Sequence, residues 1–167
     1  MAAGTLISVA EYLSTSYDPD CDYVDGVLID RNVGERDHSQ LQTDLSTYLN
    51  VRSKEWGIRV LVEQRVQVKP ARFRVPDICA LPRSGPNEPI VTSPPLFCIE
   101  ILSQDDRWSR MQEKIDDYLS FGIRYVWVID PRSRKAYEFT AAGMHEVREL
   151  RTQDDPEIIV PLEAGFE

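Results

Sequence analysis

Two apolar segments on either side of an amphipathic one constrain the fold of this chain more than any other feature. The segment LFCIEIL, residues 96–102, is the short apolar run typical of a buried strand. Residues 107–121 carry apolar side chains at helical spacing, and Gly122 follows them as a helix stop. The segment IRYVWVID, residues 123–130, is almost continuously apolar, as expected at the centre of a sheet. The sequence therefore predicts a helix between two buried strands.

The N-terminal third of the chain predicts two more helices and a hairpin. Ser8 and Glu11 have the spacing of a capping box, so a short helix should start near Val9. The dipeptide Asp25-Gly26 suits a tight turn between two short strands. A longer helix should follow, with an apolar stripe made of Leu41, Leu45, Tyr48 and Leu49.

Alternating apolar residues from 58 to 68 predict one continuous strand, with Gln64 on its apolar face. The segment RVPDICAL, residues 74–81, is a further short strand, and a loop rich in proline and glycine follows it. Weaker strand candidates lie at 144–150 and 157–160. The order of elements predicts an α/β fold in which helices flank a mixed sheet.

The length of 167 residues suits one domain with a substantial core. We divide it into an N-terminal helix and hairpin at 5–31, a core with the candidate site at 37–140, and C-terminal strands at 141–167. No apolar stretch reaches the roughly 18 residues of a membrane helix, and the N-terminus lacks the pattern of a secretion signal. Three cysteines at irregular spacing favour the reducing cytoplasm over a disulfide framework.

The net charge of −9 argues against a protein that coats nucleic acid, because phosphate binding relies on lysine and arginine. Residues 64–135 differ from the rest, since their 12 basic and 9 acidic residues give a local charge of +3. The regions before and after them each carry −6. This pattern fits either chance variation on a solvated surface or a basic face around a functional site.

Two acidic residues interrupt strands that are otherwise apolar. Strand alternation places Glu100 on one face with Cys98 and Leu102, and it places Asp77 on one face with Cys79. An unpaired carboxylate there would cost several kcal/mol, so each needs a metal ion, a basic side chain or exposure at a strand end. Together the two indicate a site for a hard cation, since Mg²⁺ is commonly held by one or two carboxylates and water.

Lys114 lies at the edge of the apolar stripe on the predicted helix at 107–121. From that position an extended side chain can reach along the sheet toward the strand ends. A lysine in such a place either lays its stem on apolar surface with its head in water or completes a charged site.

These segments resemble the bacterial restriction endonuclease family of the Uma type, which has the PD-(D/E)XK nuclease fold. The resemblance rests on RVPDICAL, CIEILSQDDRW and EKIDDYLSFGIRYVWVIDP, and it also covers YVDGVLI and the helix near His38. It runs from about Tyr12 to Tyr137. A Glu-x-Lys motif of the wider superfamily would place lysine where this chain has Leu102. The family lysine is matched instead by Lys114.

The resemblance implies an endodeoxyribonuclease that uses Mg²⁺, or Mn²⁺ in its place, to hydrolyse phosphodiester bonds. Asp77 and Glu100 match the acidic ligands, and the backbone carbonyl of Ile101 is a further candidate ligand. The metal would polarise a phosphoryl oxygen and lower the pKa of the attacking water. Lys114 would orient that water or stabilise the charge that develops on the phosphate. The candidates for supporting positions around the site are His38 and Gln64.

Three alternatives stay open at this point. The chain could be a degenerate nuclease fold that binds nucleic acid or a protein without catalysis. It could hold zinc through Cys79, Cys98 and His38, although no Cys-x-x-Cys element is present. A purely structural protein would leave the two acids unexplained. For a nuclease we expect a homodimer by fold analogy, because cutting both strands of duplex DNA usually requires two sites and two-fold dimers are the commonest closed oligomers.

Overall fold

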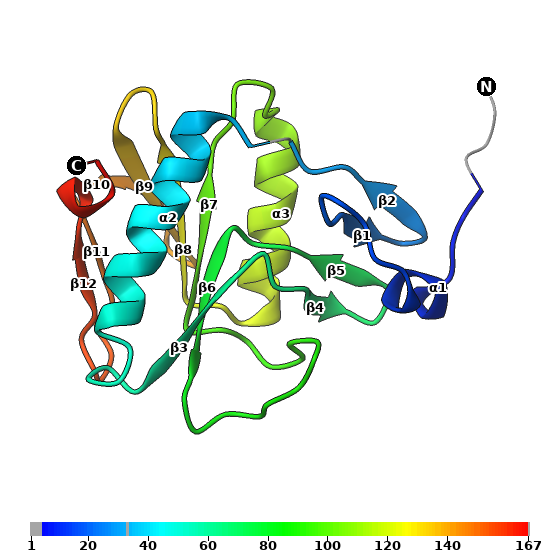
Figure 1. Cartoon of the computed structure of the whole chain (residues 1–167), viewed down its shortest axis with the longest axis horizontal. Helices are drawn as coiled ribbons and strands as arrows, with labels where there is room; N and C mark the ends of the chain where they lie inside the picture. The colour runs from blue at the N-terminus through cyan, green and yellow to red at the C-terminus, as the bar shows by residue number, and fades with distance from the viewer. Residues whose placement is uncertain (1–4, 33, 167) are drawn as a thin grey trace.

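A six-stranded sheet forms the centre of the molecule (Figure 1). The computed structural model describes residues 5–32 and 34–166. The strands β7 and β8 are parallel and are connected by the helix α3, Trp108–Phe121, whereas the other neighbouring strands are antiparallel. This arrangement confirms the predicted helix between two buried strands. The strands lie in the order β10 (Gly143–Val147), β9 (Lys135–Thr140), β8 (Tyr125–Asp130), β7 (Phe97–Ile101), β6 (Ile78–Pro82) and β3 (Ile58–Val62).

The two long helices cover opposite faces of this sheet, because β7 sends alternate side chains to each face. On one face, Phe97, Ile99 and Ile101 share an apolar core with the leucines of α2, Arg36–Val51. On the other face, Cys98 shares a core with the apolar side chains of α3. The predicted mixed sheet with flanking helices is therefore confirmed.

A second, four-stranded antiparallel sheet lies beside α3 (Figure 1). The predicted hairpin turn is present, since Asp25 and Gly26 have φ angles of 50° and 94°. The predicted helix α1, Val9–Ser14, is also present, and the Ser8 hydroxyl accepts a hydrogen bond of 3.1 Å from the Glu11 amide. The strands lie in the order β2 (Val27–Ile29), β1 (Asp22–Val24), β5 (Arg72–Arg74) and β4 (Val66–Lys69).

The prediction of one continuous strand from 58 to 68 was wrong, because β3 and β4 belong to different sheets. The chain leaves β3 at Glu63, whose φ of 51° is incompatible with extended backbone. Two hydrogen bonds of 2.6 and 2.7 Å then hold the guanidinium of Arg65 on Asp20, beside the second sheet. The alternating apolar residues of this segment therefore pack in two separate cores, and they do not form one face of a single strand.

The C-terminal segment forms a small hairpin and a 3₁₀ turn against α2. The candidate strand at 144–150 divides into β10 and β11 (Glu149–Arg151), and the candidate at 157–160 becomes β12, Ile159–Pro161. Gly165 ends the 3₁₀ turn Leu162–Gly165, and a Cβ atom there would overlap the Leu41 side chain. None of the helices in the described ranges is both long and apolar enough to cross a membrane.

Candidate active site

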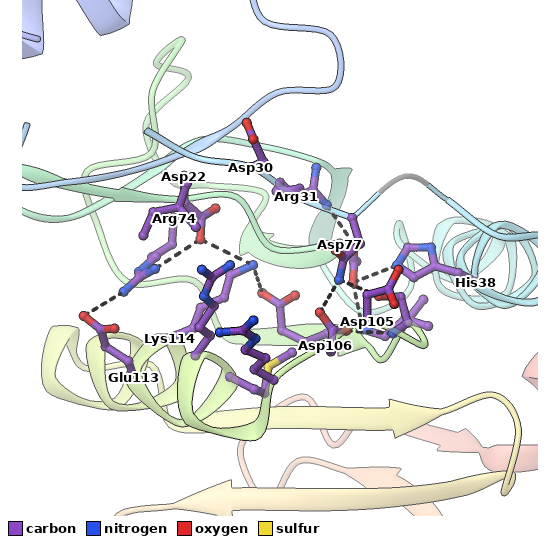
Figure 2. A pocket seen from close by; sticks show the side chains of 18 residues that line it. Asp22, Asp30, Arg31, His38, Arg74, Asp77, Asp105, Asp106, Glu113 and Lys114 are labelled. Atoms are coloured by element: carbon purple, nitrogen blue, oxygen red, sulfur yellow. Dashed lines mark hydrogen bonds and ion pairs between the residues drawn. The ribbon is translucent and has the colours of Figure 1, made fainter. Parts of the chain in front are cut away.

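A polar cavity of about 110 Å³ opens where the ends of β6 and β7 meet α3 and the second sheet (Figure 2). The register pairs Ile78 with Ile99, so Asp77 and Glu100 come to the same end of this strand pair. Acidic and basic side chains from both sheets meet there. Those lining the cavity are Asp22, Asp30, Arg31, His38, Arg74, Asp77, Glu100, Asp105, Asp106, Arg107, Arg110, Glu113 and Lys114.

Asp77 is a buried carboxylate that is held from three sides. Its Oδ2 accepts a 2.7 Å hydrogen bond from the Ile101 amide, and Nη2 of Arg31 donates to its Oδ1 at 2.7 Å. Nε2 of His38 lies 3.3 Å from Oδ2 (Figure 2). Burial would raise the pKa of Asp77, but the His38 hydrogen bond and the charges of His38 and Arg31 outweigh it and lower this pKa. Asp77 is therefore an anion in the folded chain.

Glu100 lies in the middle of β7 and is 3% exposed. Its Oε1 accepts a 2.6 Å hydrogen bond from the Tyr118 hydroxyl and lies 2.9 Å from Nζ of Lys114. Burial raises the pKa of Glu100 to about 7, and the charge of Asp77 adds to this effect while Lys114 opposes it. Within the described residues, no donor binds its Oε2. Glu100 thus offers one carboxylate oxygen to the cavity.

Lys114 points into the protein rather than into solvent, with an exposed fraction of 9%. Besides contacting Glu100, its ammonium donates a 3.2 Å hydrogen bond to the carbonyl of Val75 and lies 3.7 Å from Oδ2 of Asp22. Burial would lower the pKa of Lys114, but the charges of Asp22 and Glu100 raise it above its ordinary value. The side chain is therefore a fixed cation of the site. Leu102, the position at which the resemblance would place a lysine, packs in the apolar core under α3.

The structure brings most of the sequence-predicted site residues together, but it does not bring Gln64 to them. The Gln64 amide donates to the carbonyls of Pro89 and Arg65 at 2.9 and 3.1 Å, away from the cavity. Its assignment failed because the strand that was expected to carry it breaks at Glu63. Ile101 does line the cavity, beside Asp77.

The zinc alternative is not supported by the placement of its residues. Cys79 and Cys98 are fully buried in the apolar core under α3, whereas His38 contacts Asp77. Over residues 5–32 and 34–166, no group of three or more His, Cys, Asp and Glu side chains is arranged to hold a metal ion. Any metal ligand set at the cavity must therefore include backbone or water oxygens beside the two carboxylates.

Several charged residues of the cavity were missed by the sequence reasoning. Asp22 on β1 accepts a 2.9 Å hydrogen bond from the Val75 amide and pairs with Arg74 at 3.2 Å. Arg74 in turn pairs with Asp117 of α3 at 2.6 Å, and both side chains are buried. The available signal was weak: charged residues alternate with one aromatic residue in the short strand β5, RFR. This network joins the second sheet to the helix that carries Lys114.

The linker between β2 and α2 is tied across the cavity mouth. The Asn32 amide donates to the Ser103 hydroxyl and to Oδ1 of Asp106, both at 2.6 Å. Asp106 also accepts a 2.7 Å hydrogen bond from the Ser103 amide. These contacts fix the position of the neighbouring Arg31 above Asp77.

Comparison with known proteins relates the whole chain to nucleases. The model of the Uma2 family, described as "Putative restriction endonuclease", matches residues 9–167. The crystal structure of a "putative nuclease belonging to DUF820" from Anabaena variabilis ATCC 29413 superposes with a TM-score of 0.79. The two chains are 21% identical, and the alignment covers 96% of this chain and 97% of that one. No curated protein matches the chain. The fold is thus that of this nuclease-like structure, a mixed sheet flanked by helices, as the sequence predicts.

Proposed function

Because the chain belongs to the Uma2 family and is therefore of the nuclease type, we propose that its cavity is the active site of a metal-dependent endonuclease acting on DNA. One observation carries this proposal. Asp77 directly precedes β6, Glu100 lies in β7 and Lys114 in α3, and the three meet in one cavity, with Lys114 2.9 Å from Glu100. Two carboxylates beside a fixed ammonium are the groups that phosphodiester hydrolysis needs.

The donor set at the cavity fits Mg²⁺ or Mn²⁺. Asp77 and Glu100 offer carboxylate oxygens, and the carbonyl of Ile101 is a third candidate, all of them hard ligands. The cavity of about 110 Å³ leaves space for the waters that Mg²⁺ retains, since one water needs only about 10–15 Å³. A bound metal would supply Lewis acidity to a phosphoryl oxygen and to the attacking water.

The side chains of the site would then act by position and charge. The Lys114 ammonium is held on Glu100 and on the Val75 carbonyl, so it can donate a hydrogen bond to the attacking water or to a phosphate oxygen without rearranging. His38 helps to fix the orientation of the Asp77 carboxylate, because it contacts Oδ2, the same oxygen that accepts the Ile101 amide hydrogen bond.

Two further arginines of the cavity are suited to the phosphates beside the scissile bond. Arg107 and Arg110 line the cavity, and in the described part of the chain neither makes an ion pair. They lie within the segment 64–135, whose local charge is +3 in a chain of net charge −9. Exposed, unpaired arginines of this kind bind nucleic-acid backbones and make affinity depend on salt.

The test combines metal binding with DNA cleavage. Isothermal titration with Mn²⁺ alone should show binding to the wild type and its loss in Asp77→Asn and in Glu100→Gln, while Asp130→Asn, outside the cavity, serves as the matched control. A supercoiled plasmid should be nicked in Mg²⁺ and left intact in EDTA. Mn²⁺ binding without cleavage would favour a binding module, and absence of Mn²⁺ binding by the wild type would contradict the metal site.

We also propose a homodimer, since cleavage of both DNA strands usually uses two active sites and two-fold dimers are the commonest closed oligomers. Light scattering should give the mass of two chains. A monomer mass at high protein concentration would contradict this assembly.

A further inference from the structure

Arg31 is a cation of the cavity, with a side chain 12% exposed, and it makes few hydrogen bonds to the described residues. A guanidinium has five N–H donors. Arg31 donates from Nη2 to Asp77 at 2.7 Å, and its Nη1 lies 3.8 Å from Oε2 of Glu63, too far for a hydrogen bond. Within the described residues no other acceptor binds it. Donors of Arg31 that bind no protein acceptor in the described residues therefore face the cavity that Asp77 and Glu100 also line.

A second arginine of equal burial shows the contrast. Arg31 and Arg65 both have side chains that are 12% exposed, and both pair with an aspartate. Arg65, however, makes four hydrogen bonds, two to Asp20 and one each to the carbonyls of Tyr12 and Thr15. Arg65 thus uses four of its five donors, as expected of an arginine that only holds the fold together. Arg31 uses one within the described residues.

The position of Arg31 is set by its chain neighbours rather than by its own contacts. The two 2.6 Å hydrogen bonds of Asn32 anchor the linker to Ser103 and Asp106. The guanidinium can therefore change partner while the backbone stays in place. Its present partner is Oδ1 of Asp77, and the proposed metal ligand set would use the same carboxylate. Arg31 and a divalent cation would thus compete for Asp77.

We propose that Arg31 is a catalytic residue that leaves Asp77 when the ligand set forms and binds the non-bridging oxygens of the scissile phosphate. This inference rests on the proposed function. The planar guanidinium matches phosphate geometry through paired N–H donors, and it retains its charge at any physiological pH. Negative charge grows on those oxygens in the transition state, so a preorganised arginine there accelerates the reaction.

The experiment compares Arg31→Ala with Arg65→Ala, a control of equal burial outside the cavity. Three quantities are measured: the plasmid nicking rate in Mg²⁺, the affinity for Mn²⁺ alone, and the affinity of a fluorescent DNA duplex in Ca²⁺. Arg31→Ala should slow nicking by about 100-fold and weaken duplex binding. It should leave Mn²⁺ affinity unchanged or make it tighter, because a competing cation is gone. Arg65→Ala should lower the melting temperature and leave all three quantities unchanged.

The outcomes separate this inference from the proposed function. Nicking by Arg31→Ala at the wild-type rate would overturn the role of Arg31, and so would loss of Mn²⁺ affinity, which a merely structural ion pair predicts. If the wild type does not cleave DNA, the proposed function fails, and duplex affinity in Ca²⁺ then decides whether Arg31 contacts phosphate. Should Arg31→Ala not fold, Arg31→Lys keeps the charge but loses the paired donors, and it should bind Mn²⁺ normally and nick slowly.

Discussion

Nζ of Lys114 lies 2.9 Å from Oε1 of Glu100, although the first residue belongs to a helix and the second to a strand. The strand position that shares a face with Glu100 is occupied by Leu102. The geometry expected of a lysine that has moved from the strand to the following helix is therefore present. The proposed role of the ammonium depends on its distance from Glu100, and a lysine at another place in the sequence can satisfy that distance.

Lys114→Ala should reduce DNA cleavage by at least about tenfold, which corresponds to about 1.4 kcal/mol of transition-state stabilisation. Mn²⁺ affinity, measured by titration calorimetry, should be nearly unchanged because an ammonium is not a metal ligand. Lys135→Ala, which removes a half-exposed lysine of β9, is the control and should be silent. Full activity of Lys114→Ala would refute the role given to this lysine.

The double variant Leu102→Lys with Lys114→Ala should cleave faster than Lys114→Ala alone. Position 102 lies on the Glu100 face of the strand, so a lysine there can restore an ammonium to the site. Circular dichroism must first show that the fold tolerates the new charge. A folded double variant with no gain in rate would argue that the position of the helix lysine cannot be replaced.

Tyr118→Phe should lower the free energy of unfolding by about 1.5–3 kcal/mol, because a buried carboxylate loses the donor that binds it at 2.6 Å. Tyr12→Phe is the matched control, since the equally buried Tyr12 hydroxyl donates to the neutral Cys21 carbonyl at 2.7 Å. Loss of this hydrogen bond in Tyr12→Phe should lower the free energy of unfolding by about 1 kcal/mol. Urea denaturation measures both values, and equal costs would contradict the charge assistance inferred for Glu100.

Asp117→Ala should destabilise the fold by about 3–5 kcal/mol, because it leaves the buried guanidinium of Arg74 without its closest partner. The neighbouring Asp116 is exposed, and its side chain accepts a 2.9 Å hydrogen bond from the Gln112 amide. Asp116→Ala should therefore change stability by less than about 0.5 kcal/mol. Thermal or urea unfolding of the two variants tests this, and similar values would remove the structural role of the Arg74 network.

Asp130 should make stability depend on acidic pH. Burial tends to raise its pKa, but hydrogen bonds from the Arg132 amide and the Ser133 hydroxyl prevail and lower it below the ordinary 3.8. A carboxyl whose pKa is lower in the folded chain than in the unfolded chain stabilises the fold at any pH above its pKa in the unfolded chain. This contribution is lost as the pH falls through its pKa in the folded chain. The free energy of unfolding of the wild type should exceed that of Asp130→Asn by about 1 kcal/mol at neutral pH. This difference should start to shrink near pH 3.8 and disappear only below the lower pKa that Asp130 has in the folded chain. A constant difference across this range would contradict the assignment.

The sequence predicts those parts of the site that follow from local periodicity. Strand alternation predicts the direction of Glu100, and helical spacing predicts that Lys114 lies at the edge of the stripe on α3. The adjacency of β6 and β7 then brings Asp77 to Glu100. Each of these three predicted positions depends only on the periodicity of one element or on the pairing of two neighbouring strands.

The remaining parts depend on where the second sheet docks, and periodicity carries no information about that. Asp22 and Arg31 reach the cavity only because the chain leaves the central sheet at Glu63 and builds β4 and β5 beside α3. The sequence has no glycine or proline at this break that would predict it. The same unmarked break explains why Gln64 was assigned to the wrong face.

The hydrogen bond from the Ile101 amide to Asp77 gives the site a built-in spectroscopic reporter. This backbone proton has a carboxylate as its acceptor at 2.7 Å, in a position that is 2% exposed. Its chemical shift and its exchange with deuterium therefore depend on the electron density left on that one oxygen. Any cation that approaches the carboxylate, whether guanidinium, imidazolium or metal, should move a single resolved amide signal, so occupancy of the site can be followed in solution without substrate and without turnover.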